Sequence, residues 1–212
     1  MAAEVADISN LDENGDILDA NDRRRMNSLG NRQWHTDYTF KECAGKYSFL
    51  RALVVTGEGG ETKFTDMRAA YDALSDKKKA EIADLVAEHS LVYSRGLIGF
   101  TDYAEEEVRR LGSAKQRVVR THPGSGRKTL YLAAHAMRIE DMPIPEGRIL
   151  LKDLMEHATE PRFVYTHRWR VGDMVMWDNR CTMHRACEYD PGSVRELRRT
   201  TAMEEASTLV LG

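Results

Sequence analysis

Two side chains that can bind a metal ion, His35 and Asp37, stand two positions apart in the sequence. If this segment is a β-strand, both side chains leave the same face, because successive side chains of a strand alternate between faces. A third ligand, His184, would come from a distant strand. Two histidines and one carboxylate on one side of a metal leave adjacent coordination positions open, as a non-haem Fe(II) oxygenase requires. A structural zinc site would instead be closed by four protein ligands.

The open positions predict a chelating co-substrate, 2-oxoglutarate, whose distant carboxylate then needs a fixed cation. Arginine suits this role because its planar guanidinium binds a carboxylate through two hydrogen bonds and keeps its charge. In an extended strand, Arg195 and Arg199 would face inward while Arg198 would face the surface. The two inward cations could serve two anions, the 2-oxoglutarate tail and an anionic substrate. Thr62 follows two glycines, which allow close backbone approach, and is predicted to donate its hydroxyl to the same 2-oxoglutarate carboxylate.

Arg199 has a second interpretation. An arginine next to other charged residues can belong to a solvated ion-pair network, here with Glu196 or Glu204. The sequence leaves both interpretations open.

The elements that must position these residues are mostly short strands. Residues 47–55 are rich in apolar and β-branched side chains and end in glycines, which predicts a strand that runs into a turn. Helices are predicted over residues 66–74, capped by Thr65, over residues 76–88, capped by Ser75, and over residues 150–157. Residues 11–29 are polar and predict a surface loop or a partly ordered excursion. Further strands are predicted over residues 117–121, 129–133, 163–169, 173–177, 184–189 and 195–202, with a hairpin turn between the first two.

This pattern predicts a mainly β protein with helical insertions, an antiparallel barrel or jelly roll with helices packed outside. The length of 212 residues fits a single domain over residues 1–212. The net charge of −3 argues against a nucleic-acid or membrane partner. No apolar run is long enough to span a membrane, and residues 1–5 do not read as a signal peptide.

The three cysteines form no CxxC pair, which indicates a reducing, cytoplasmic location rather than a disulfide framework. Cys181 stands near the predicted ligand His184, but it is interpreted as a small packing residue.

Several blocks together resemble the Fe(II)/2-oxoglutarate-dependent dioxygenases of the taurine dioxygenase and 2,4-dichlorophenoxyacetate dioxygenase type. They occur in the family's order, over roughly residues 5–205, and they read WHTDYTF at 34–40, GGETKFTDM at 59–67, WDNRCTMHRA at 177–186 and RELRRTT at 195–201. The phenoxyalkanoate branch looks most similar, through VADISN at 5–10, DMRAAYDAL at 66–74 and RTHPGSGRK at 120–128.

The resemblance implies a double-stranded β-helix, the clavaminate synthase-like jelly roll. It implies that His35, Asp37 and His184 bind iron and that Thr62 and Arg195 bind 2-oxoglutarate. It further implies a substrate-side role for three residues, Arg199, His122 and Asn31. His122 precedes a proline in the predicted hairpin, so it could equally cap the turn.

The expected activity is hydroxylation of a small anionic substrate, an aryloxyalkanoate such as 2,4-dichlorophenoxyacetate, with Fe(II), 2-oxoglutarate and O2. The alternatives are a taurine or alkylsulfonate dioxygenase, a non-catalytic jelly roll that binds a metal or a small acid, and a fragment that pairs with another chain through a sheet edge. The last two arise because members of the family usually carry a substantial segment before the block at residues 5–10. Self-association into a homo-oligomer stays open.

Overall fold

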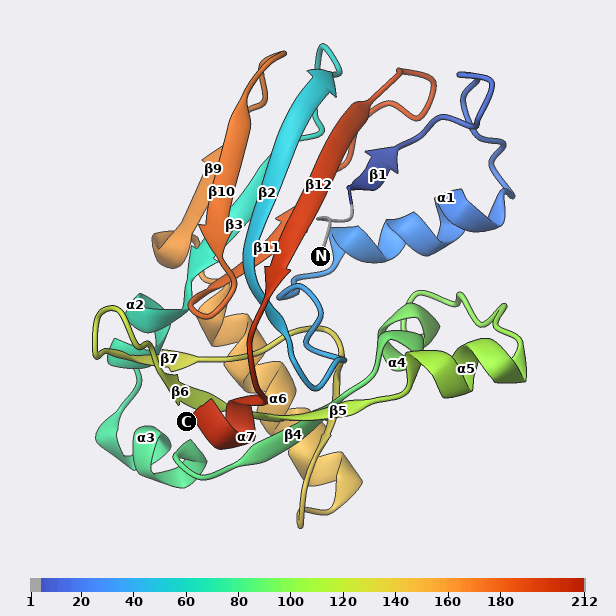
Figure 1. Ribbon diagram of the computed structural model, residues 1–212. Helices are drawn as coiled ribbons and strands as arrows, with labels where there is room; N and C mark the ends of the chain where they lie inside the picture. The colour runs from blue at the N-terminus through green and yellow to red at the C-terminus, as the bar shows by residue number, and fades with distance from the viewer. Residues whose placement is uncertain (1–4, 212) are drawn as a thin grey trace.

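Two antiparallel sheets face one another in the upper part of the molecule (Figure 1). The structure is a computed structural model that describes residues 5–211. One sheet has the strand order β1 (Ala6–Ser9), β12 (Glu196–Met203), β2 (Gly45–Val54) and β10 (Met174–Asp178). The other has the order β11 (Thr182–Ala186), β3 (Thr62–Asp66) and β9 (Val164–His167). The predicted jelly roll with helical insertions is therefore confirmed.

The two sheets share one apolar core. Leu50 and Ala52 of β2, Leu197 of β12, Trp177 of β10 and Phe64 of β3 form a buried cluster between them. In β2 the buried side chains Ser48, Leu50 and Ala52 alternate with less buried ones, as expected for a strand with one face against a core.

A second core lies below the sheets, around helix α6 (Ile144–Ala158) (Figure 1). It includes Leu150, Leu151 and Leu154 of α6 and Met183 of β11. The strands around it are β4 (Val86–His89), β5 (Ala114–Arg117) and β8 (Ala136–Ile139), in the order β5-β4-β8, and the hairpin β6 (Val119–Thr121) and β7 (Lys128–Leu130). The remaining helices are α1 (Arg23–Ser28), α2 (Met67–Asp72), α3 (Asp76–Ile82), α4 (Leu91–Gly96), α5 (Glu105–Leu111) and α7 (Thr208–Leu211), with short 3-10 turns η1 (Leu29–Arg32) and η2 (Pro161–Phe163).

Several predicted boundaries are wrong. The helix expected over residues 76–88 ends at Ile82, because Val86 to His89 pair with both β5 and β8 as strand β4. The helix expected over residues 66–74 is capped by Asp66 rather than Thr65, since the Asp66 carboxylate accepts from the Arg68 and Ala69 amides. The loop expected over residues 11–29 contains α1, capped in the same way by Asp22.

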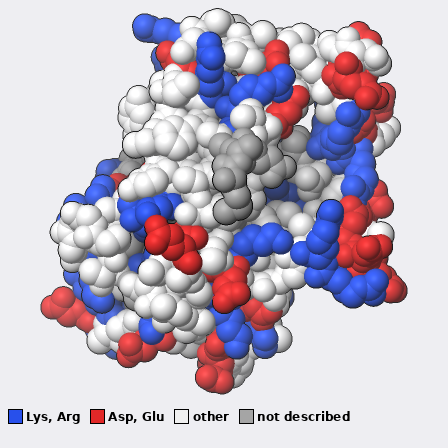
Figure 2. Space-filling view, in the orientation of Figure 1, with Lys and Arg blue, Asp and Glu red and all other residues white. Residues whose placement is uncertain are grey.

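Charged side chains of both signs mix on the surface over α1, α4 and α5 (Figure 2). Arg23 of α1, for example, pairs with Asp102 and with Glu107 of α5. None of the helices within residues 5–211 combines the length and the apolar character that crossing a bilayer requires. The signal-peptide prediction concerns residues 1–5, most of which lie outside the described residues.

A buried histidine in β4 makes the fold sensitive to acid. His89 is fully buried, and within residues 5–211 neither ring nitrogen has a hydrogen-bond partner. Burial therefore lowers the pKa of His89 to about 3. Above pH 6.5 the imidazole is neutral in both the folded and the unfolded chain. As the pH falls from 6.5 towards 3, only the unfolded chain takes up the proton, so the folded state loses stability over this window.

We therefore expect the His89→Leu variant to lose less stability than the natural chain when the pH drops from 7.5 to 5. The expected difference in that loss is about 2 kcal/mol, from 1.36 kcal/mol per pH unit below an ordinary histidine pKa. Urea unfolding at both pH values measures it, and the pH 7.5 curves serve as the reference. Equal losses for the two proteins would show that His89 is protonated as readily in the folded chain as in the unfolded one.

Candidate metal centre

The fold brings His35, Asp37 and His184 together at one buried point. One donor atom from each of the three lies within 4.8 Å of the others. The Asp37 Oδ1 and Oδ2 atoms lie 3.8 Å from His35 Nε2 and 3.9 Å from His184 Nε2, respectively. Two backbone hydrogen bonds join the histidines, from the His35 amide to the His184 carbonyl at 2.9 Å and from the His184 amide to the His35 carbonyl at 2.8 Å.

The backbone around His35 and Asp37 differs from the predicted strand. His35 forms an isolated bridge with His184, and Asp37 already belongs to a turn. Tyr38, the next residue, adopts a positive φ of 58°, which strands do not use. The strand prediction for this segment is wrong because the chain must leave the sheet there. The Gly45 amide bonds the Asp37 carbonyl at 3.1 Å and so closes the turn.

The Asp37 carboxylate is held as a charged group on both of its oxygens. Ser48 donates to Oδ2 at 2.6 Å, and Arg199 Nη1 donates to Oδ1 at 2.9 Å. Burial raises the pKa of this carboxyl, but the charge of Arg199, together with the Ser48 hydrogen bond, outweighs burial and holds the pKa below its usual range. Asp37 is therefore an ionised carboxylate held in one orientation at neutral pH.

The two imidazoles are held in the neutral form. Burial lowers the pKa of His184 to about 3, with a further contribution from His35, and burial also lowers the pKa of His35. His35 Nδ1 lies 2.8 Å from the Gln33 carbonyl, so this nitrogen carries the proton and the Nε2 lone pair is directed towards Asp37. Histidine binds metals in this neutral form. Two neutral imidazoles and one carboxylate fit a divalent cation that keeps open positions.

His184 is enclosed by aromatic rings. Its ring centroid lies 4.6 Å from that of Trp177 and 6.1 Å from that of Phe64. Its Nδ1 is buried and has no hydrogen-bond partner in the part of the chain that the structure describes. These rings shield one side of the site from water.

Arg195 and Thr62, the predicted 2-oxoglutarate residues, are both buried near Gly60. Arg195 Nη2 donates to the Gly60 carbonyl at 3.0 Å, and the guanidinium lies over the Tyr189 ring at 5.4 Å. Burial lowers the pKa of Arg195, and no carboxylate within residues 5–211 forms an ion pair with it. Thr62 opens β3, and its hydroxyl accepts from Trp169 Nε1 at 3.0 Å.

Arg199 faces inward, as the alternation of side chains along the strand predicts, but the sequence did not predict its ion-pair partner. The parity is correct, since Arg198 lies at the surface with Asp7 and Glu196 while Arg199 faces inward. The alternative interpretation, an ion-pair network of Arg199 with Glu196 or Glu204, is not found, because these two carboxylates pair with Arg198 and Arg120. Arg199 instead binds the ligand carboxylate of Asp37.

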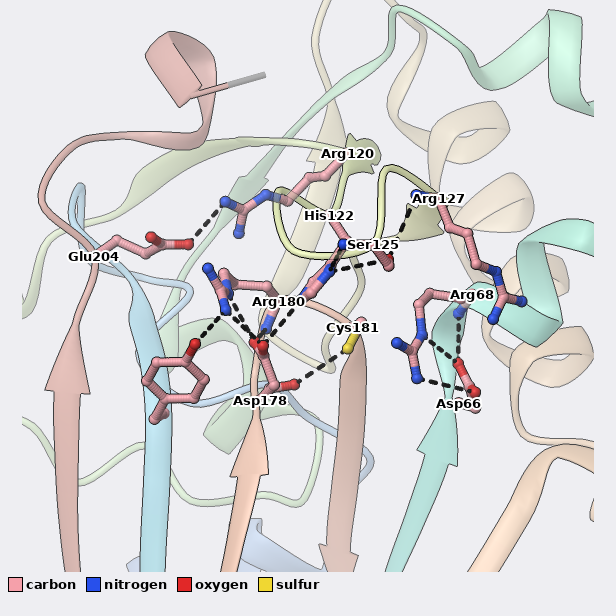
Figure 3. Close-up of polar contacts among 11 residues, drawn as sticks. Asp66, Arg68, Arg120, His122, Ser125, Arg127, Asp178, Arg180, Cys181 and Glu204 are labelled. Atoms are coloured by element: carbon pink, nitrogen blue, oxygen red, sulfur yellow. Dashed lines mark hydrogen bonds and ion pairs between the residues drawn. The ribbon is translucent and has the colours of Figure 1, made fainter.

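His122 caps its own hairpin turn, as one of the two interpretations from the sequence predicts, and its substrate-side role stays a prediction. Its Nδ1 lies 3.1 Å from Ser125 Oγ, and its Nε2 lies 3.0 Å from Asp178 Oδ2 (Figure 3). Both ring nitrogens are thus engaged by protein groups. Asn31, in η1, contacts the guanidinium of Arg95, with 3.5 Å from its Oδ1 to Arg95 Nη2.

Cys181 lies near His122 and Asp178 and completes a second group of metal-binding residue types. Arg180, however, donates to both Asp178 oxygens, at 2.8 and 2.7 Å (Figure 3). This guanidinium already compensates the carboxylate, so the cysteine is the buried packing residue that the sequence predicts.

The sequence predicted neither Ser48, which bonds the Asp37 carboxylate, nor Arg95, which contacts Asn31. Ser48 stands on the inward face of the predicted strand over residues 47–55, and a polar residue on that face is a usable signal. Arg95 lies in α4, a helix that the sequence did not predict, and nothing in the sequence marks it.

Comparisons with known proteins agree with this geometry. Residues 3–201 match the family described as taurine catabolism dioxygenase TauD, TfdA family. The chain is 48% identical over 204 residues to the alpha-ketoglutarate-dependent 2,4-dichlorophenoxyacetate dioxygenase of Cupriavidus pinatubonensis. This alignment covers 96% of this chain and 71% of that protein. It is 39% identical to the (S)-phenoxypropionate/alpha-ketoglutarate-dioxygenase of Sphingobium herbicidovorans, over 88% of this chain and 68% of that one.

Two solved structures are also similar over most of this chain. The crystal structure of AAD-2 in complex with Mn(II) and N-oxalylglycine superposes with a TM-score of 0.94 at 52% identity, covering 97% of this chain and 76% of that one. A taurine dioxygenase from Burkholderia xenovorans superposes with a TM-score of 0.73 at 28% identity, over 95% of this chain and 62% of that one. This chain belongs to the TauD/TfdA family of Fe(II)- and 2-oxoglutarate-dependent dioxygenases.

Proposed function

We propose that this chain hydroxylates an aryloxyalkanoate, such as 2,4-dichlorophenoxyacetate, at the carbon beside the ether oxygen. One atom of O2 enters the substrate and the other enters 2-oxoglutarate, which is oxidised to succinate and CO2. The hydroxylated ether is a hemiacetal and collapses to a phenol and an oxo acid. The buried set of two neutral histidines and one ionised aspartate carries the proposal. The names of the relatives at 48% and 39% identity support the substrate class.

In this proposal His35, Asp37 and His184 hold the iron. Bound there, iron and 2-oxoglutarate together supply the oxidation of the substrate by O2. Ser48 and Arg199 keep the Asp37 carboxylate ionised and in one orientation through their two hydrogen bonds. The Gln33 carbonyl fixes the tautomer of His35.

Arg195 and Thr62 bind the distant carboxylate of 2-oxoglutarate. A buried guanidinium without an acidic partner is a strong site for an anion, because the anion restores the hydrogen bonds and charge compensation that burial removes. Thr62 supplies a hydroxyl near the same point, two residues after Gly60.

The Arg195→Met variant is expected to bind 2-oxoglutarate at least ~30-fold more weakly, since removing one partner of a buried charge pair costs about 2 kcal/mol or more. Titration of the iron-loaded protein with 2-oxoglutarate in the absence of O2 measures the change. Arg198→Met removes the neighbouring surface cation of β12 and should leave the affinity unchanged. If Arg195→Met keeps the natural affinity, the 2-oxoglutarate carboxylate binds elsewhere.

The substrate class is tested with the iron-loaded protein, 2-oxoglutarate and O2. We expect succinate and a phenol in equal amounts from 2,4-dichlorophenoxyacetate. Taurine is the second arm, because the matched family is also named for taurine catabolism. Sulfite from taurine without phenol from the ether would replace the aryloxyalkanoate assignment by an alkylsulfonate one.

We propose that the chain acts as one dioxygenase domain in the cytoplasm. Neighbouring strands join the two cores, since Met183 of β11 packs in the lower core and Phe64 of its partner β3 in the upper one. All three cysteines are free, which suits a reducing compartment.

A further inference from the structure

The outer face of the sheet β11-β3-β9 carries a groove on the side away from the metal centre. Thr62 of β3 and His184 of β11 are buried on the inner side of this sheet. Their next neighbours along the strands, Lys63 and Arg185, therefore point outward, because successive side chains of a strand alternate. Met183 packs in the lower core with α6, so one end of the outer face is covered. The other end is hollowed into a groove of about 780 Å³, a size that suits a small-molecule ligand.

The groove is lined mainly by cations. Its charged lining residues are Arg32, Lys63, Arg168 and Arg185, with two acids, Glu61 and Glu188. Arg32 and Glu188 compensate one another, with 3.1 Å between Arg32 Nη1 and Glu188 Oε1. Within residues 5–211, none of the other three cations forms an ion pair, and Glu61 forms none either. Three cations and one acid remain, so the groove keeps two positive charges in excess.

Strand pairing places the three unpaired cations side by side. Arg185 of β11 lies directly opposite Lys63 of β3, and Lys63 lies opposite Thr166 of β9. Arg168 stands two residues after Thr166 and lines the groove with it. Neighbouring strands are about 4.8 Å apart, so these side chains stand across roughly 10 Å of sheet. Like charges directly opposite one another on adjacent strands are destabilising, and an anion between them would remove the repulsion.

The other sheet shows how the chain compensates such a pair with its own acids. Arg51 of β2 and Arg198 of β12 also lie directly opposite one another. Arg198, however, pairs with Asp7 and with Glu196. No described side chain does the same for the two opposed cations of the groove. The compensation that the chain supplies on one sheet is left to a ligand on the other.

The guanidinium of Arg185 is held in place while its hydrogen-bonding groups stay free. It lies over the Trp34 ring, with 5.3 Å from Cζ to the ring centroid. Its Nε is buried and has no hydrogen-bond partner in the part of the chain that the structure describes. A buried donor without a partner is costly, because it has lost its bonds to water. An anion in the groove would restore this lost interaction.

The placement of the donors favours a phosphate group over a carboxylate. The Arg185 guanidinium, the Lys63 ammonium and the Thr166 hydroxyl belong to three different strands around the groove. A carboxylate offers two oxygens in one plane, whereas a phosphate group offers three strong acceptor oxygens that point in different directions. A phosphate group carries a charge of about −1.5 to −2 at neutral pH, which matches the excess of positive charge in the groove.

We propose that this groove binds the phosphate or diphosphate group of a small molecule. Lys63, Arg185 and Arg168 bind the phosphate oxygens, and Thr166 donates its hydroxyl. The site lies on the outer face of the sheet whose inner face carries His184, so it is separate from the metal centre. It goes beyond the proposed dioxygenase function and does not depend on the substrate of that reaction.

The test is calorimetric titration of the metal-free protein with inorganic pyrophosphate at low ionic strength. Lys63→Met and Arg185→Met should each bind pyrophosphate at least ~10-fold more weakly, which corresponds to about 1.4 kcal/mol for a lost hydrogen bond to a charged group. Glu61→Gln should bind it about 2- to 5-fold more tightly, because the variant removes a nearby negative charge at a partly exposed site. Residues that only support the fold would not shift the affinity in opposite directions.

A second probe, adenosine diphosphate, distinguishes the sources of the phosphate group. Tighter binding of the nucleotide than of pyrophosphate would identify a phosphorylated metabolite as the ligand. Equal affinities would identify a site that recognises the phosphates alone. Lys63→Met should weaken the binding of both probes, and either result supports the groove as a phosphate site.

The matched control is Arg51→Met. Arg51 is an exposed strand arginine of the other sheet and forms no ion pair within residues 5–211, so this variant should keep the natural affinity. Arg195→Met reports any binding at the metal centre. The proposal is overturned if pyrophosphate does not bind, if Arg51→Met weakens binding as much as Lys63→Met, or if Arg195→Met abolishes binding while Lys63→Met does not. Each of these results leaves the proposed dioxygenase function standing.

Discussion

The His184→Ala variant is expected to lose iron binding and, with it, succinate production. Removing a group that merely supports a metal ligand costs about 10- to 100-fold in affinity or activity, so losing the ligand itself should exceed ~100-fold. The remaining His35 and Asp37 would leave a cation with only two protein ligands. Iron content after gel filtration and succinate formation with 2-oxoglutarate and O2 measure the two effects.

A control is needed because His184 also packs against Trp177 and Phe64. His184→Gln keeps most of the volume and should lose iron equally. His157→Gln removes an imidazole that bonds the Ala70 carbonyl and Glu160, away from the ligand set, and should retain iron. Full iron occupancy in folded His184→Ala protein would remove this residue from the centre and with it the proposed ligand set.

The largest effect on stability is expected at the buried pair of Arg120 and Glu204. The two side chains form an ion pair (Figure 3), with 2.8 Å between them, and are 3% and 5% exposed. Arg120 also lies over the Tyr131 ring at 4.8 Å. The Glu204→Gln variant leaves the guanidinium buried without an anion. Its free energy of unfolding should fall by about 3–5 kcal/mol, the range seen when one partner of a buried ion pair is removed.

Urea unfolding measures this loss. The double variant Arg120→Met with Glu204→Leu should recover most of it, because apolar residues of similar volume can replace a buried ion pair at little cost. The surface pair of Lys152 and Glu156 on α6 offers a comparison, since Glu156→Gln should change stability by less than about 1 kcal/mol. Were Glu204→Gln as stable as the natural chain, the pair would contribute no net stability.

The alternation of side chains along strands was the most reliable basis for predicting the site from the sequence. It separated inward Arg199 from outward Arg198 on β12, because the alternation of side chains is fixed by backbone geometry alone. The apolar strands and turn glycines likewise predicted the jelly roll. The same reasoning placed His35 and Asp37 on a strand, which is wrong, although the two side chains do meet. A positive φ is uncommon for a tyrosine, so the residue type of Tyr38 does not reveal it.

The sequence did not indicate which charged side chains pair with one another. The sequence allowed Arg199 to meet Glu196, Glu204 or a substrate, and the structure pairs it with Asp37. Helix α4 was also not predicted, because it follows a strand that the sequence predicted as the end of a helix. Pairing of β4 with β5 and β8 overrode the local helical pattern there, and such pairing between distant segments is not encoded in a short window.

The backbone bridge between His35 and His184 also has a thermodynamic consequence. It joins a turn near the start of the chain to a strand near its end, and the ligand side chains stand on both sides of the junction. A metal held there binds the closed arrangement and not the separated segments. At a free metal concentration 100 times its dissociation constant, binding adds about 2.7 kcal/mol to the stability of the folded chain. Iron bound by the proposed ligand set would therefore cross-link two segments that lie far apart in the chain as well as serve as the catalytic metal, and iron supply in the cell would influence how long each molecule survives proteolysis.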